Sequence, residues 1–237
     1  MKAKLAIVVF LVASIIVVVG ITTSQNLNNS QLKALEDKEK RDKLSFKERA
    51  ELAKIRGKKQ VTAPGIVTLH PVAASPEEIE QLLPKYTIIL AELVEEFSSL
   101  RDPRTLQSWY KFKTLDTLSQ MPPQQSFAVR EVPAQLQDLK DDEFLVPGAG
   151  GVLTVDGVEV IQNDETIPRF KKNRKYLLLL SLNPATRIAE LALGPQSILP
   201  VKNDHSLDPT ANEYQLQQTI RKFHNSSLDQ LKRNIRK

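Results

Sequence analysis

Hydrophobic and polar positions divide this chain into four stretches, of which the first is an apolar run from Leu5 to Ile21. It follows Lys2 and Lys4 and precedes a polar tract. Its 17 residues match the shortest membrane-spanning helix, whereas a signal-peptide core has about 7 to 15. No Ala-x-Ala cleavage site or lipoprotein cysteine follows the run. We therefore predict a membrane anchor within residues 1–24, with a cleaved signal peptide as the alternative.

The orientation of this anchor follows from the charges in its flanks. Lys2 and Lys4 precede the run, and Lys33 alone follows it closely, which favours an internal amino terminus and an extracytoplasmic body. The far-side lysines and arginine at positions 38–41 weaken this argument. A cytoplasmic location of the body is therefore the alternative.

The second stretch, residues 25–60, is rich in charged helix formers without a sustained heptad. Within it, Ser45 and Glu48 match a capping box, and Gly57 is placed to end the helix that follows. We predict a charged helical linker that acts as a solvated spacer. Its basic excess also suits contact with anionic lipid headgroups.

The third stretch, residues 61–211, has short apolar runs that predict a β-rich domain. Ser75 and Pro76 predict the start of a short helix that ends near Leu83. Strands are expected at 86–94 and 109–115, and a third at 127–132.

A hairpin is the clearest local prediction in this domain. Asp156-Gly157 lies between two valine-rich runs, so Leu153, Val155, Val158 and Val160 are expected to share a buried face. Residues 175–182 predict a central strand that is covered on both faces. We favour a further strand at 187–193, although its alanines also suit a helix.

The fourth stretch, residues 212–237, has helical periodicity, with Ser227 expected to cap a last helix. The fold class is therefore α+β: a membrane helix and helical linker, then a mainly antiparallel β barrel or sandwich closed by carboxy-terminal helices. If the protein instead assembles through these helices, Leu216, Ile220 and Phe223 are expected to form an exposed apolar stripe.

Residues 83–207 resemble a β-rich domain of uncharacterised bacterial envelope proteins. The resemblance is carried by Gly150-Gly151, Pro168-Arg169-Phe170, the run 176–180 and Leu193-Gly194-Pro195. Leu179 departs from the pattern, in which an aromatic residue is common at this place. The resemblance implies a small β barrel or sandwich outside the cytoplasm, and it supplies no known catalytic residue.

Composition and charge narrow the function further. The chain has no cysteine, which excludes disulfides and thiolate chemistry, and its aromatic content is only 5%. Residues 30–60 carry a net charge of +5, residues 61–211 carry −6, and residues 212–237 carry +4. Because the positive charge is split around an acidic body, nucleic-acid binding is not expected.

Candidate chemistry is sparse. His70, His205 and His224 lack metal-site spacing and are expected at the surface or as caps, and we expect no metal or cofactor. The glycines at 148–151 predict a turn or bulge because they precede a hairpin and lack a phosphate-loop ending. The basic cluster comprises Arg169, Lys171, Lys172 and Arg174; it could bind phosphate or an acidic partner, but solubility is its simpler use.

Three functions follow, in order of preference. The first is a membrane-tethered extracytoplasmic binding or structural module that uses residues 5–21 as its anchor and has a possible protein partner. The second is an envelope hydrolase with carboxylates from separate segments, for which neighbouring carboxylates such as Glu95 and Glu96 provide no direct support. The third is an assembly protein that uses its carboxy-terminal helices.

Overall fold

The computed structural model describes residues 29–70, 73, 75–121, 132–167, 169–202, 215–225 and 227–235. The predicted membrane run at 5–21 lies outside these residues. Within the described ranges, no helix combines the length and apolar character needed to cross a membrane. The chain divides into two compact units, Met1–Leu44 and Ser45–Lys237. The first contains α2 (Asn29–Lys40).

The second unit begins with α3 (Phe46–Ile55), a helix that the sequence placed in the linker. Its predicted capping box is confirmed: Ser45 Oγ accepts the Glu48 N–H, and the Glu48 carboxylate accepts the Ser45 N–H at 2.8 Å. Gly57 follows the helix with a φ of +67°. The apolar face of α3 packs on β-strands within the same unit, so α3 is part of the folded body and the spacer is shorter than expected.

Helix α3 packs on a three-stranded sheet. Its order is β1 (Gln60–Thr62), β6 (Val158–Gln162) and β5 (Gly151–Val155). The predicted hairpin is confirmed, with Val155 opposite Val158. The turn has positive φ at Asp156 and Gly157, as a two-residue hairpin requires. Its expected apolar face lies in one cluster with α3, where Val158 and Val160 are buried and Leu153 and Val155 are half-buried.

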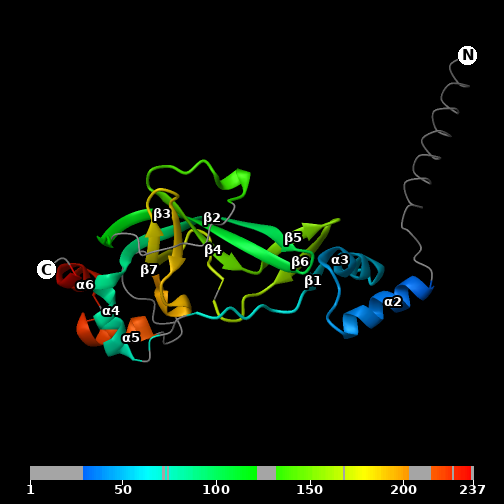
Figure 1. Ribbon diagram of the computed structural model, residues 1–237, viewed down its shortest axis with the longest axis horizontal. Coiled ribbons are helices and arrows are strands. Elements are labelled where there is room, and N and C mark those ends of the chain that lie inside the picture. Colours follow the sequence, from blue (N-terminus) through cyan, green and yellow to red (C-terminus); the bar gives the residue numbers. More distant parts are fainter. Residues whose placement is uncertain are drawn as a thin grey trace, which may run out of the picture. The chain divides into compact units, whose positions relative to one another are not determined.

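The larger sheet has six strands in the order β2-β3-β4-β8-β7-β9; Figure 1 labels four of them, β2, β3, β4 and β7. A further antiparallel pairing joins β7 to β2, so the pairings through β2, β3, β4, β8 and β7 return to their start. The strands are β2 (Thr87–Asp102), β3 (Thr105–Ser119), β4 (Glu143–Ala149), β7 (Lys175–Asn183), β8 (Ile188–Leu191) and β9 (Ile198–Val201).

Two of these strands are longer than predicted. β2 continues beyond Val94 to Asp102, and β3 begins at Thr105 rather than near Trp109. The hydrophobic pattern is interrupted here because Val94 is an extra residue between the pairs Leu93–Phe112 and Glu95–Lys111. The predicted strand at 127–132 lies outside the described residues except for Val132, which is not in a strand.

The central position of β7 is confirmed. Leu177 and Leu179 lie in one buried cluster, which we call the helix-facing cluster, and Tyr176, Leu178 and Leu180 lie in another, the aromatic cluster. Because side chains alternate along a strand, these clusters cover opposite faces of β7. The strand expected from 187–193 is also confirmed, as β8.

Helices cover the first of these clusters. α4 (Pro76–Leu82), α5 (Gln215–Phe223) and α6 (Leu228–Ile235) lie beside one another at the carboxy-terminal end of the body (Figure 1). Each contributes apolar side chains to the helix-facing cluster. Ser75 caps α4 and Ser227 caps α6, as predicted. Short 3₁₀ turns occupy Leu83–Lys85, Ala134–Leu136 and Gly194–Ser197. The protein is therefore an α+β protein with a β-rich body and carboxy-terminal helices.

Candidate functional site

The predicted basic cluster lies in the connection between β6 and β7. Arg169 donates from Nε and Nη2 to the carboxylate of Glu96 on β2, each at 3.0 Å. Lys171 and Lys172 are exposed, and Arg174 is half-buried. The basic cluster is therefore folded against β2, and its two lysines face solvent.

Three acidic residues of β2 lie opposite or pair with cations of neighbouring segments. Glu96 holds Arg169, Glu95 forms an ion pair with Lys111 at 2.8 Å, and Glu92 is the register partner of Lys175. The hydrogen bond that Lys111 donates to the Glu95 carboxylate raises the pKa of Lys111. The adjacent carboxylates of Glu95 and Glu96 are thus each engaged with a cation.

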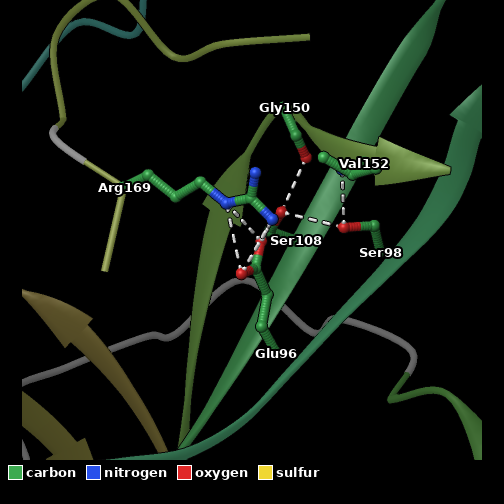
Figure 2. A network of polar contacts seen from close by, with 6 residues as sticks. All are labelled: Glu96, Ser98, Ser108, Gly150, Val152 and Arg169. Carbon is green, nitrogen blue, oxygen red and sulfur yellow. Dashed lines mark hydrogen bonds and ion pairs between the residues drawn. The ribbon is translucent and has the colours of Figure 1, made fainter. Parts of the chain in front are cut away.

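A second polar network lies where β4 passes into β5, behind the Arg169–Glu96 pair (Figure 2). Ser108 on β3 donates its hydroxyl to the Gly150 carbonyl at 2.7 Å. The Val152 N–H donates to Ser98 Oγ at 3.1 Å, and the two serine hydroxyls are 3.4 Å apart. The serines therefore tie three strands together, and their contacts resemble a structural cross-link more than an activated nucleophile.

Glycines allow the backbone between β4 and β5 to lie this close to Ser98 and Ser108. Gly150 and Gly151 have φ of +75° and +135°, and a Cβ on Gly151 would lie 2.6 Å from Ser108 Oγ and closer still to Ser98 Oγ. Gly148, Gly150 and Gly151 lie near the end of β4, between β4 and β5, and at the start of β5, respectively. The Gly150 amide is used within the fold: its N–H donates to the Leu106 carbonyl at 3.0 Å.

A cluster of aromatic side chains lies next to the Arg169–Glu96 pair and the serine network. Tyr110 is 5% exposed, and burial together with the nearby Glu96 charge raises its pKa to about 12. Its ring meets that of Phe170 at 4.8 Å between centroids. Phe112 and Tyr176 also contact Phe170 edge to face, at 5.0 and 5.1 Å. Phe170 thus joins the polar connection to the aromatic cluster.

The histidine predictions need one correction. His224, expected at the surface or as a cap, is 1% exposed and lies 2.8 Å from Glu80 Oε2 through Nε2. Its Nδ1 is 3.2 Å from the Asn234 amide nitrogen. It therefore joins α4 to the two last helices. His70 is partly buried against Gly194, and His205 lies outside the described residues.

Two of the three residues of the predicted apolar stripe on the last helices are buried. Leu216 and Ile220 are both 0% exposed in the helix-facing cluster, whereas Phe223 is 37% exposed. An amphipathic pattern cannot distinguish a face that binds a partner from one that covers the protein's own sheet. Here two of its three residues cover the sheet.

Gln162 is a buried connector that the sequence analysis missed. It is 5% exposed, accepts the Leu106 N–H at 2.8 Å, and donates to the carbonyls of Pro64 and Arg104. Only its place at the end of a predicted strand was visible in the sequence. Its partners come from segments that the sequence pattern does not relate.

No three metal-ligating side chains of His, Asp or Glu come together among the residues that the structure describes. Comparison of the chain with protein-family models found no match, and comparison with curated proteins found none either. The functional argument therefore rests on the chain's own residues.

Proposed function

We propose that this protein is a membrane-tethered, extracytoplasmic binding or structural module. The observation that carries the proposal is how the body uses its polar groups. Ser98 and Ser108 bind backbone, Glu95 and Glu96 bind cations, and His224 lies between two helices. These contacts stabilise the fold, which suits a module that presents a surface.

The tether in this proposal is the apolar run at residues 5–21. In this proposal a charged spacer that contains α2 follows the anchor in the sequence. Within the spacer, the Lys40 ammonium and the Asp37 carboxylate form an ion pair at 3.6 Å. The fold supports a finer proposal as well: the circuit of strand pairings that returns from β7 to β2 is suited to a small barrel. Such a barrel would agree with the resemblance to bacterial envelope domains.

The two alternatives have less support. A hydrolase needs two carboxylates from separate segments placed across a cleft, and the described carboxylates Glu95 and Glu96 are adjacent and paired with Lys111 and Arg169, so they do not supply such a site. Assembly through the last helices needs an exposed apolar stripe, and Leu216 and Ile220 are buried. We therefore retain the module as the proposed function.

Protease treatment of intact spheroplasts tests the proposal. With the full chain expressed in a bacterium, external protease should cut the body without lysis. A body that is protected until lysis would contradict the proposed orientation.

A charged residue placed within the apolar run tests whether this run anchors the protein. Val12→Arg places a cation in the middle of the run, where it costs about 2.5 to 3.5 kcal/mol on insertion scales, so the chain should leave the membrane fraction. Thr23→Arg, placed beyond the run, should leave it there. Equal membrane retention of the two variants would contradict anchoring by this segment.

A further inference from the structure

The end of α3 and the turn after it present a dense group of cations at the surface of the body. Residues 54–59, which we call the α3-end patch, contain no acidic residue and carry a net charge of +4. The four cations are all exposed: Lys54, Arg56, Lys58 and Lys59. The basic excess that the sequence assigned to a linker is thus carried in part by the folded body.

The lysine side chains of this patch are not needed to cap the helix. The Lys58 N–H donates to the Ala53 carbonyl at 2.8 Å, and the Gly57 N–H donates to the Lys54 carbonyl at 2.9 Å. With Gly57 at a φ of +67°, these two bonds form a Schellman motif, in which backbone donors satisfy the last carbonyls of a helix. The helix end is therefore complete without a side-chain cap.

An apolar side chain lies among these cations. Ile55 is 45% exposed, whereas Phe46, Ala50 and Ala53 form the face of α3 that packs on the small sheet. Ile55 is not part of that packed face, so its exposure has no role in folding α3 onto the body. An aliphatic residue flanked by lysine and arginine is typical of segments that lie in a membrane interface, where the cations bind headgroups and the apolar residue enters the boundary.

The patch is held in a fixed conformation by the main chain. Helix α3 precedes it, and the Lys59 carbonyl accepts the Glu159 N–H at 2.9 Å where β1 begins beside β6. The cations therefore project from a helix end, a defined turn and a strand. Because the surface is already ordered, little conformational entropy is lost when it binds.

The charge of the remaining body favours contact with an anionic surface through this patch. Residues 61–211 carry a net charge of −6, opposite in sign to residues 54–59. An anionic bilayer attracts the patch and repels the acidic part of the body, so the two effects orient the body in the same way. A nucleic-acid backbone would also bind the cations, but it offers no apolar boundary for Ile55.

We propose that the α3-end patch binds the anionic phospholipid headgroups of the membrane that holds the anchor, with Ile55 entering the headgroup boundary. The inference deepens the proposed function and rests on its tether. Only residues 22–53 separate the apolar run from the patch, so the tether keeps the bilayer at a high effective concentration and a small patch suffices.

A fluorophore beside the patch tests this contact. Because the chain has no cysteine, Gln60→Cys accepts a single nitrobenzoxadiazole label next to Lys59, where Gln60 is exposed. Gln135→Cys is the matched control, since Gln135 is also exposed but precedes the acidic segment 138–142. Each full chain is placed in nanodiscs of phosphatidylcholine, alone or mixed equally with phosphatidylglycerol, with headgroup-spin-labelled lipid as the quencher.

Phosphatidylglycerol should increase quenching of the label at position 60 and leave the label at position 135 unchanged. Raising the salt from about 0.1 to about 1 M, which shortens the screening length from about 10 to about 3 Å, should remove this increase. Equal quenching at position 60 with and without phosphatidylglycerol would overturn the proposal.

Neutral substitutions locate the contact within the chain. Lys58→Gln combined with Lys59→Gln should weaken it about 30-fold, the product of about fivefold for each lysine near an anionic surface. Arginine at both positions should retain it. Lys171→Gln combined with Lys172→Gln removes the same charge from the basic cluster and should have no effect. Equal weakening by the two pairs of glutamine substitutions would contradict a contact through the α3-end patch.

Ile55→Gln separates a lipid surface from a soluble anion. It should weaken the contact because the side chain that enters the headgroup boundary is lost, and an unchanged contact would contradict binding to a lipid surface. Failure of the chain to enter nanodiscs would contradict the tether, and this proposal with it. Entry without quenching that depends on phosphatidylglycerol would overturn the patch alone.

Discussion

Gly151→Ala should be among the most destabilising single-methyl changes in the body. Gly151 has a φ of +135°, a conformation that costs a residue with a side chain about 1 to 3 kcal/mol. The new Cβ would also lie 2.6 Å from Ser108 Oγ and 2.9 Å from Ser98 Cβ. To relieve these contacts the serines must move, which weakens the hydrogen bonds to Gly150 and Val152 at about 1 kcal/mol each. We expect a total loss of about 3 to 5 kcal/mol.

Gly157→Ala is the matched control for this change. Gly157 also has a positive φ, of +80°, but a Cβ there would meet nothing within 4 Å. Its loss should therefore be limited to backbone strain, about 1 to 2 kcal/mol. Urea denaturation followed by the fluorescence of Trp109, the single tryptophan, measures both variants in the full chain. Equal destabilisation by the two changes would refute the argument that crowding by the serines determines the cost at Gly151.

Three further changes test other parts of the structure. Gln162→Ala should lower the free energy of unfolding by about 1 to 3 kcal/mol because the buried Leu106 N–H and the part-buried carbonyls of Pro64 and Arg104 lose their partner, whereas Gln137→Ala on the surface should change it by less than about 0.5; similar urea midpoints would contradict this. Ser45→Ala should cost about 1 kcal/mol through loss of the capping box, and a full recovery of stability in Ser45→Asp would identify the cap as the cause. Burial raises the folded pKa of Tyr110 to about 12, so its contribution to stability is whole below about pH 10 and is lost as the pH rises toward 12. Tyr110→Phe should therefore lose less stability than the wild type between pH 9 and pH 11, and parallel losses would contradict the assignment.

Local rules predicted much of this fold. Asp156-Gly157, the Ser45 box, Ser75-Pro76 and the leucines of β7 each carry their structural information within a few residues, and all four predictions are confirmed. The extent of β2 and β3 was missed because the bulge at Val94 shifts the alternation of side chains.

The contacts of the candidate site were harder to predict. Arg169 and Glu96 are distant in sequence, and so are Ser108 and Gly150, so nothing local indicates that they meet. Burial of Leu216 and Ile220 was ambiguous for a different reason. An apolar helix face has the same spacing whether it covers a sheet or binds a partner.

The tether is tested most directly by the intact mass of the chain recovered from washed membranes. The full chain, expressed in a bacterium and extracted after an alkaline carbonate wash, should have a mass of about 26.7 kDa that includes residues 5–21. Such a mass in the membrane pellet is the result that the proposal predicts. A soluble product that has lost this run would contradict tethering and identify the run as a cleaved signal peptide.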